Sequence, residues 1–415
     1  MNSMWHACGS FVAFQPFLIR GGAKTMELKP TPFRDEFPRA DGAVCLNHAG
    51  ISPIPQRTAR TITQLATFMT RQQSFRYAVL EETLQKARMT IAALIGCHAT
   101  EVAFTRNTSE ALSHVALGLD WRAGDEIVTT DQEFPSNLVV WLDIARRKGV
   151  TVHQVPSLPN RGVSTAALLE RVNHRTRVLT VSSVQYATGA GVDLEAMGAA
   201  LKNTPTLFVV DAVQSLGALP LDVKRMGIDA LAAGGHKWLL APEGCGLFHL
   251  SPKALSQVQP RILGWHSVQN AGDYTHITIE PREGVLRFEA GTHNVIGAAA
   301  LAESIALLLE AGRETVAQRI RLLTRSFIQE LTRRGCVVIT PLDQDHQCVA
   351  GILVFKHPTV DATTLHRHFL ANNIEQVSRS GGIRFAPHFY QDQGDVLKVM
   401  EVMDRAVTTP AVQRH

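Results

Sequence analysis

Residues 206–215 are Thr-Leu-Phe-Val-Val-Asp-Ala-Val-Gln-Ser, an apolar run that ends in an acidic residue and a polar cluster. The run has the length and composition of a β-strand that is buried on both faces. A carboxylate at the end of such a strand needs a partner, because an isolated buried charge is costly. Two interpretations of Asp211 therefore stay open here: it caps the next helix, or it carries function.

Similar apolar runs lie on both sides of this stretch, at 101–105, 126–130, 150–155, 177–183, 230–233 and 246–250. Helix-like segments separate several of them, at 136–148, 165–172 and 193–202. Such an alternation predicts an α/β fold, a mostly parallel sheet covered by helices on both faces, which gives three layers. Ligands of these sheets bind beyond the carboxyl ends of the strands.

The pattern changes after about residue 294, where helices at 295–311 and 314–333 precede strand-like runs and two further helices, at 362–371 and 394–406. This order is typical of a smaller α+β domain. We predict a loose N-terminal extension at 1–25 and a segment at 26–60 that packs with the small domain. The large domain is predicted at 61–293 and the small C-terminal domain at 294–415.

Composition excludes several classes of protein. The 415 residues are 45% hydrophobic and 19% charged, with a formal net charge of +4, so a nucleic-acid partner is not expected. No run approaches the ~18 apolar residues of a membrane span. The six cysteines form no C-x-x-C pair, which favours reduced thiols in a cytoplasmic protein. His366 and His368 point apart on a helix, and no metal site is predicted.

A second motif follows the strand at 230–233. Residues 231–238 are Leu-Ala-Ala-Gly-Gly-His-Lys-Trp, which places Lys237 between a glycine pair and a bulky aromatic residue. A desolvated lysine has a lowered pKa and is suited to forming a Schiff base. The plainer interpretation is a lysine that extends to solvent from a loop.

Two further motifs could bind anions. Thr108 and Ser109 follow a strand and begin a helix, where hydroxyls and free backbone N–H groups form a phosphate site or simply a capping box. Arg384 follows the glycine pair at 381–382 and could hold a carboxylate by two parallel hydrogen bonds, or could lie on the surface beside a turn.

In this order, the four motifs resemble the fold-type I pyridoxal-phosphate (PLP) enzymes, and among these the class V aminotransferase family. That family includes cysteine desulfurases, C–S lyases and isopenicillin N epimerase-like proteins. The resemblance runs from about residue 45 to residue 390. It implies a pyridoxal 5'-phosphate cofactor, an α-amino-acid substrate and a homodimer with shared active sites.

The resemblance also implies roles for residues at the centre of the site. Lys237 would hold the cofactor as a Schiff base and move the α-proton, and Asp211 would face the pyridine nitrogen. Gln214 would hydrogen-bond the phenolic oxygen. Thr108 and Ser109 would hold the phosphate.

Other positions of the family pattern lie around this centre. His236, a further catalytic candidate, would contribute on the phosphate side, and Phe134 would stack on the ring, where many desulfurases carry a histidine that Phe cannot replace as a proton donor. Either Gln185 or Tyr186 would approach the phenolic oxygen. Thr292 would reach the phosphate of the neighbouring subunit.

The substrate side of the pattern involves three more residues. Arg384 would bind the substrate α-carboxylate. Asn47 and His48 belong to an N-terminal loop at the substrate mouth.

Two departures from the family pattern stand out. Gly234 occupies a position where many relatives carry Ser, so one phosphate-binding hydroxyl is missing. Desulfurases also carry a nucleophilic cysteine on a mobile loop shortly before the carboxylate-binding arginine, whereas the short interval from Val377 to Arg384 has none. Cys348 is interpreted as a structural cysteine. A persulfide mechanism is therefore disfavoured.

The sequence predicts a PLP-dependent enzyme that removes the α-proton of an amino acid. C–S β-elimination without a catalytic cysteine is favoured over transamination and epimerisation in the same family. An alternative of another class is a PLP-binding scaffold without turnover.

Overall fold

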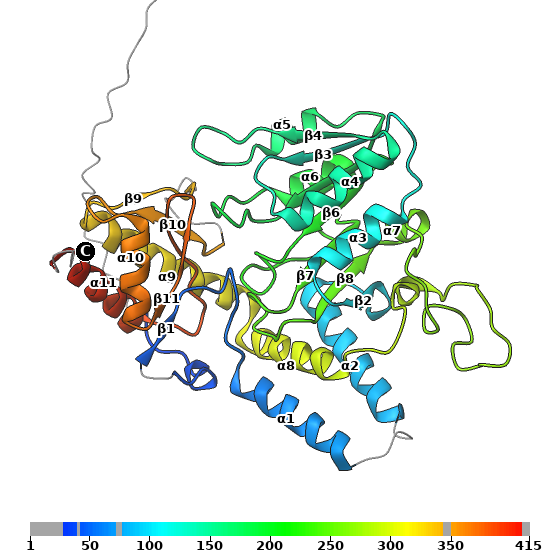
Figure 1. Ribbon diagram of the computed structural model, residues 1–415, viewed down its shortest axis with the longest axis horizontal. Helices are drawn as coiled ribbons and strands as arrows, with labels where there is room; N and C mark the ends of the chain where they lie inside the picture. The colour runs from blue at the N-terminus through cyan, green and yellow to red at the C-terminus, as the bar shows by residue number, and fades with distance from the viewer. Residues whose placement is uncertain (1–27, 40–41, 72–76, 343–349, 409–415) are drawn as a thin grey trace, which may run out of the picture.

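The computed structural model describes residues 28–39, 42–71, 77–342 and 350–408. The predicted extension at 1–25 lies outside the described residues. Figure 1 shows a large domain, in cyan to green, beside a small domain in which the blue N-terminal segment meets the orange and red C-terminal elements.

The large domain is built on a seven-stranded sheet with the order β2-β8-β7-β6-β5-β3-β4. Only β8 runs antiparallel to its neighbours, so the sheet is mostly parallel, as predicted. The strands are β2 (Val102–Thr105), β3 (Glu126–Thr130), β4 (Thr151–Val155), β5 (Thr176–Ser182), β6 (Leu207–Asp211), β7 (Ala230–Gly234) and β8 (Gly246–Leu250).

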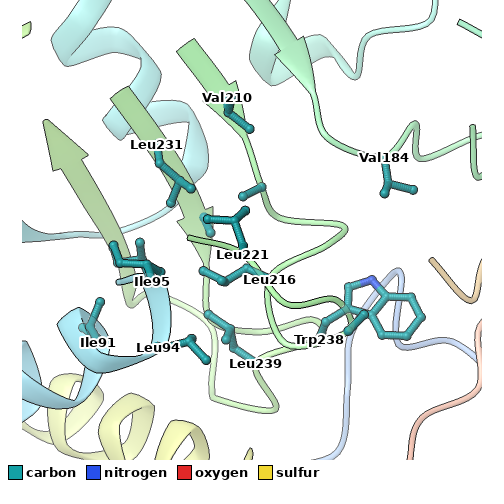
Figure 2. Close-up of a cluster of buried hydrophobic side chains, with 14 of the residues drawn as sticks. Ile91, Leu94, Ile95, Val184, Val210, Leu216, Leu221, Leu231, Trp238 and Leu239 are labelled. Carbon is teal, nitrogen blue, oxygen red and sulfur yellow. The ribbon is translucent and has the colours of Figure 1, made fainter. Parts of the chain in front are cut away.

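Both faces of this sheet are covered by helices, which explains why the strands are apolar at successive positions. On β6, Phe208 and Val210 join one core cluster, and Leu207 and Val209 join the other. The first cluster includes side chains of α2 (Tyr77–Ile95), α5 (Thr165–Glu170) and α6 (Leu194–Leu201). The second includes α3 (Thr108–Gly118), α4 (Val139–Lys148) and α7 (Pro252–Gln257). Figure 2 shows part of the first cluster, with Ile91, Leu94 and Ile95 of α2 at one side of the view and Trp238 at the other.

The small domain contains the sheet β12-β13-β10-β9 and the pair β1-β11. These strands are β1 (Val44–Cys45), β9 (Val337–Val338), β10 (Leu353–Lys356), β11 (Ile374–Glu375), β12 (Val377–Arg379) and β13 (Gly382–Phe385). Its helices are α9 (Arg313–Arg333), α10 (Ala362–Ala371) and α11 (Gln393–Thr408). Leu28, Val44 and Leu46 lie in its core, so the N-terminal segment packs with the C-terminal domain.

Helix α8 (Val295–Ala311) joins the two domains. Its buried side chains belong to the core cluster of the large domain, and it packs against α2 and α1 (Gln56–Arg71). The predicted boundary at residue 294 therefore precedes a helix that packs with the large domain, and the small-domain core begins in α9. No single described helix is long and apolar enough to span a membrane; only α8 and α9 taken together satisfy length and composition, and they are bent by 81°.

The predicted elements differ from the observed ones mainly at their ends. The helix predicted at 136–148 begins at Val139, because Pro135–Asn137 form a short 3-10 turn. Further 3-10 turns lie at Arg34–Glu36, Ala99–Glu101 and Gly284–Phe288. One of the strand-like runs expected after residue 333, at 350–355, forms a strand only from Leu353, after Gly351 with its positive φ of 77°. The β12–β13 hairpin was not predicted, because its strands are short and one of them is polar.

Candidate active site

A cavity of about 480 Å³ lies where the strands of the large sheet end and the small domain meets them. Most of the predicted site residues line this cavity: Asn47, Thr108, Ser109, Phe134, Tyr186, Asp211, Gln214, His236, Lys237 and Arg384. Three predicted site residues, His48, Gln185 and Thr292, lie elsewhere. The fold thus gathers side chains that are as far apart in the chain as residues 47 and 384.

Asp211 is the last residue of β6 and Lys237 follows β7, and the carboxyl ends of these adjacent strands point to the cavity. Asp211 is buried, its Oδ1 accepts the Val213 N–H at 3.0 Å, and burial raises its pKa to about 7. Burial also lowers the pKa of Lys237 to about 8, and its Nζ lies 5.5 Å from the centre of the Phe134 ring. A lysine in this state is an amine that is partly neutral near neutral pH.

The anion-binding end of the cavity is the start of α3. Asn107 caps the helix, since its side chain accepts the Glu110 N–H at 2.9 Å. Thr108 Oγ1 accepts the Gly234 N–H at 3.0 Å, and Ser109 Oγ donates to Ser136 Oγ at 2.7 Å. Ser136 also lines the cavity, although the sequence analysis gave it no role. Its position just after the end of β3 was the signal that could have indicated it.

Gly234 occupies the position where many relatives carry a serine that binds phosphate. A Cβ atom at Gly234 would lie 3.0 Å from His236 Nδ1 and 3.5 Å from Thr108 Oγ1. A larger side chain would therefore require the His236 ring to shift. Burial lowers the pKa of His236, so the ring is neutral. From the cavity wall it can donate a hydrogen bond to an anion bound at the start of α3.

Arg384 approaches the cavity from β13 of the small domain. It is only 3% exposed, its Nη1 donates to Tyr186 O at 2.8 Å, and its Nη2 donates to Asn47 Oδ1 at 3.4 Å. Its Nε has no partner in the described part of the chain. Burial and the neighbouring Arg379 lower its pKa to about 10. A buried guanidinium without a carboxylate beside it fits an anionic ligand.

Tyr186 and Gln185 are separated by the structure. Tyr186 lines the cavity and contacts the Phe134 ring edge to face, with 5.0 Å between the ring centres. Gln185 is buried behind it, where its Nε2 donates to Glu133 Oε1 at 2.9 Å. Of the two candidates for the phenolic oxygen, only Tyr186 is at the cavity, and its role stays a prediction.

Gln214 lines the cavity but also holds two neighbours. Its Oε1 accepts the Trp238 N–H at 2.9 Å, and its Nε2 donates to Ala49 O at 3.0 Å. The amide therefore fixes the loop at 47–50 against the segment that carries Lys237. The second N–H of Nε2 is the group that could reach a phenolic oxygen.

His48 was expected at the substrate mouth, and this placement is wrong for its side chain. The ring is fully buried, and burial lowers its pKa to about 4. In this neutral form Nδ1 donates to Ala386 O at 2.7 Å and Nε2 accepts from the Tyr390 hydroxyl at 2.9 Å. His48 joins the N-terminal loop to the small domain, because the bridge between Asn47 and Ala386 turns alternate side chains of the loop inward.

Thr292 is exposed and lines a different cavity, of about 300 Å³, together with Phe104 and His293. It does not reach Lys237 within one chain. The expectation that Thr292 reaches the cofactor phosphate of a neighbouring subunit applies to a dimer, and it stays a prediction.

Two groups of described residues bring three possible metal-ligand atoms within 4.8 Å of one another: Cys97 with Glu101 and His249, and His266 with Glu289 and His293. Glu289 is already paired with Arg88, at 2.6 Å for both N–O contacts. The expectation of no metal site stays a prediction.

The charged and hydrogen-bonding groups of the cavity fit pyridoxal phosphate. Asp211 is a buried carboxyl group with no cation bound to it. The protonated ring nitrogen of the cofactor would supply the positive charge. The start of α3 offers hydroxyls and backbone N–H groups for a phosphate. Lys237 lies between them with its amine in the cavity. This sheet, with these groups at the carboxyl ends of its strands, defines a fold-type I PLP-dependent enzyme.

The chain belongs to the class V aminotransferase family, whose family model, Aminotransferase class-V, matches residues 44–388. It is similar to a probable cysteine desulfurase of Pyrococcus abyssi, with 29% identity over 338 residues, which cover 78% of this chain and 83% of the relative. It is also similar to isopenicillin N epimerase of Streptomyces clavuligerus, with 27% identity over 376 residues, 87% of this chain and 94% of the relative.

Among solved structures, the cystine C–S lyase C-DES in complex with its reaction product, cysteine persulfide, matches with a TM-score of 0.80 and 24% identity. The match covers 88% of this chain and 98% of that one. A mutant of C-DES carries glycine linked covalently to its PLP cofactor. This likeness defines the fold, and membership of the family makes the chain a PLP-dependent enzyme, in agreement with the sequence analysis.

Proposed function

We propose that the protein cleaves the Cβ–S bond of a sulfur-containing α-amino acid by β-elimination, without a cysteine nucleophile. Relatives named as desulfurases and a structural neighbour named as a cystine C–S lyase support sulfur chemistry. Membership of the family argues against the scaffold without turnover.

The observation that carries the proposal is the short connection before Arg384. Strands β12 and β13 are joined by Ser380 and Gly381 alone, so there is no loop there that could carry a thiol to the substrate. None of the described cysteines lines the cavity. Cys348 lies outside the described residues.

The side chains of this chain suit an elimination. Pyridoxal phosphate, when bound, supplies an electron sink for the charge left on Cα. Arg384 binds the substrate carboxylate and so orients the Cα–H bond. Lys237 Nζ accepts the α-proton, since burial keeps a fraction of this amine neutral. Asp211 would hold the ring nitrogen of the cofactor and favour its protonated form, and Phe134 would exclude water without offering a proton.

Epimerisation is the second candidate, because the Streptomyces clavuligerus relative is named as an epimerase and matches over most of both chains. It needs a proton donor on the face of Cα opposite Lys237. Tyr186, which carries a hydroxyl and lines the cavity, is the candidate for this donor.

The test is an assay of the holoenzyme with a panel of L-amino acids that includes cystine and cysteine. Elimination gives pyruvate together with sulfide or a persulfide, and it should persist in Cys348→Ala. Lys237→Ala is the negative control. A keto acid that forms only with a co-substrate indicates transamination, and loss of optical rotation without pyruvate indicates epimerisation; either result would replace the proposal.

A further inference from the structure

The cavity contains a cation that the mechanism above does not use. Arg379, at the end of β12, lines the cavity together with Lys237 and Arg384. Its sequence context predicted no role for it. Unlike Arg384, its side chain is exposed, so it lies at the rim of the cavity rather than at the bottom.

The register of the hairpin turns Arg379 toward the same side as Arg384. In the antiparallel pair, Val377 faces Arg384 and Arg379 faces Gly382. Residues that face each other point to the same side of a sheet, and side chains two positions apart on a strand do as well. All three side chains of this face line the cavity, and Gly382 leaves space opposite Arg379.

The hairpin holds Arg379 in place. Ser380 and Gly381 both have positive φ, 53° and 74°, which is the backbone of a tight two-residue turn. Ser380 Oγ donates to Ala187 O at 3.0 Å, next to the Tyr186 carbonyl that accepts from Arg384. The tip of the hairpin is thus attached to the loop of the large domain that forms the cavity wall.

The charge balance of the cavity leaves Arg379 without a counter-ion. No acidic side chain of the described residues pairs with it. Asp211 is the one carboxylate of the described lining, and it forms no ion pair with Arg379, whereas Lys237, Arg379 and Arg384 are basic. The cofactor phosphate belongs at the start of α3 and the substrate α-carboxylate at Arg384. Arg379 is therefore available to bind a further anionic group.

We propose that Arg379 binds a second carboxylate, carried by the substrate side chain, and so makes the enzyme selective for amino acids with two carboxylates. The inference rests on the proposed function, because it places the α-carboxylate at Arg384. An arginine is suited to this role, since its planar guanidinium matches a carboxylate by two hydrogen bonds. The second carboxylate could belong to a dicarboxylic amino acid or to the far half of a disulfide such as cystine.

The experiment compares matched substrates in holoenzyme variants. L-cystine is paired with S-methylthio-L-cysteine, which keeps the disulfide but lacks the second carboxylate. L-aspartate and L-glutamate are paired with L-asparagine and L-glutamine in spectroscopic titrations of the bound cofactor. The variants are Arg379→Gln and Arg379→Lys, and the control is Arg325→Gln, an exposed arginine of α9 that does not line the cavity.

We expect the preference of the wild-type enzyme for the two-carboxylate member of a pair to fall roughly tenfold to hundredfold in Arg379→Gln. It should be partly kept in Arg379→Lys and fully kept in Arg325→Gln. A loss confined to the cystine pair identifies a disulfide substrate, and a loss confined to the other pairs identifies a dicarboxylic one. Equal ratios in wild type and Arg379→Gln for every pair would overturn the inference.

The two proposals fail in different ways. If no substrate yields pyruvate, C–S lyase chemistry is refuted, while the titrations with aspartate and asparagine still measure the selectivity that Arg379 gives. If pyruvate forms at the same relative rates in all variants, the lyase is supported and the role of Arg379 is refuted.

Discussion

At the scale of single residues, the cavity holds ionisable groups that form no ion pair within the described part of the chain. Asp211 and Arg384 are almost fully buried and Lys237 is partly buried, and burial shifts the pKa of each toward the neutral form. A side chain that is costly to bury in the apoprotein gains its partner from a ligand. The three residues assigned to cofactor and substrate binding therefore lower the stability of the apoprotein.

This cost can be measured for Asp211. Its pKa rises from 3.8 to about 7 on folding, so the folded state binds more protons than the unfolded state between these values and stability falls as pH increases through them. We expect apo Asp211→Asn to be more stable than the wild type above pH 7, by an amount on the order of a few kcal/mol. The difference should shrink toward pH 4. Thermal denaturation of both apoproteins from pH 4 to pH 8 measures it, and a pH-independent difference would contradict the assigned pKa.

At the scale of elements, the ends of strands and helices place the groups. Strand β6 ends at Asp211, β7 leads to Lys237, and β2 leads to α3, whose first turn faces the cavity. Free N–H groups of a helix N-terminus attract anions, so the cap that orders this turn also orders the phosphate site.

Two helix caps of the same kind separate stability from cofactor binding. Asn107 of α3 and Ser164 of α5 each accept the N–H of the residue three positions on, at 2.9 and 3.1 Å. Replacing either by Ala should lower the free energy of unfolding by about 1 kcal/mol. Only Asn107→Ala should weaken PLP binding, because α5 does not line the cavity. Denaturant unfolding and PLP titration test this, and equal PLP affinities would show that the cap does not order the site.

At the scale of the whole molecule, the site exists only where the domains meet. Arg384 comes from the small domain, the loop at 47–50 from the N-terminal segment and Lys237 from the large domain. Arg384 donates to Tyr186 O, which joins the small domain to the large domain. Gln214 donates to Ala49 O, which joins the large domain to the N-terminal segment. The position of the substrate carboxylate thus depends on the packing of both domains.

We expect a homodimer in which Thr292 contributes to the site of the neighbouring subunit. Thr292→Ala should weaken PLP binding roughly two- to tenfold, the effect of one lost hydrogen bond, and should leave the dimer intact. Thr151→Ala, at the exposed edge strand β4, is the control. Sedimentation gives the assembly state and titration gives the affinity. A monomeric holoenzyme with full PLP affinity would contradict the expectation.

The residues predicted for the centre of the site line one cavity, whereas His48, Gln185 and Thr292 lie elsewhere. Asp211, Lys237 and Arg384 were found because a charged residue beside a buried strand or a glycine pair is a local signal. Arg379 had no such signal, since an exposed arginine is an ordinary residue, and the one signal for Ser136 was its position after the end of a strand. His48 was misplaced because its burial depends on Tyr390 and Ala386, more than 330 positions further along the chain.

The sequence by itself determined the α/β class, the strands of the large sheet and the family, because apolar periodicity and short motifs are local properties of the chain. Only the tertiary structure decided that Tyr186 rather than Gln185 lies at the cavity, that α8 packs with the large domain, and that Arg379 joins Arg384 at one cavity. The physical reason is that these placements depend on the register and packing of distant segments, which no short stretch of sequence contains.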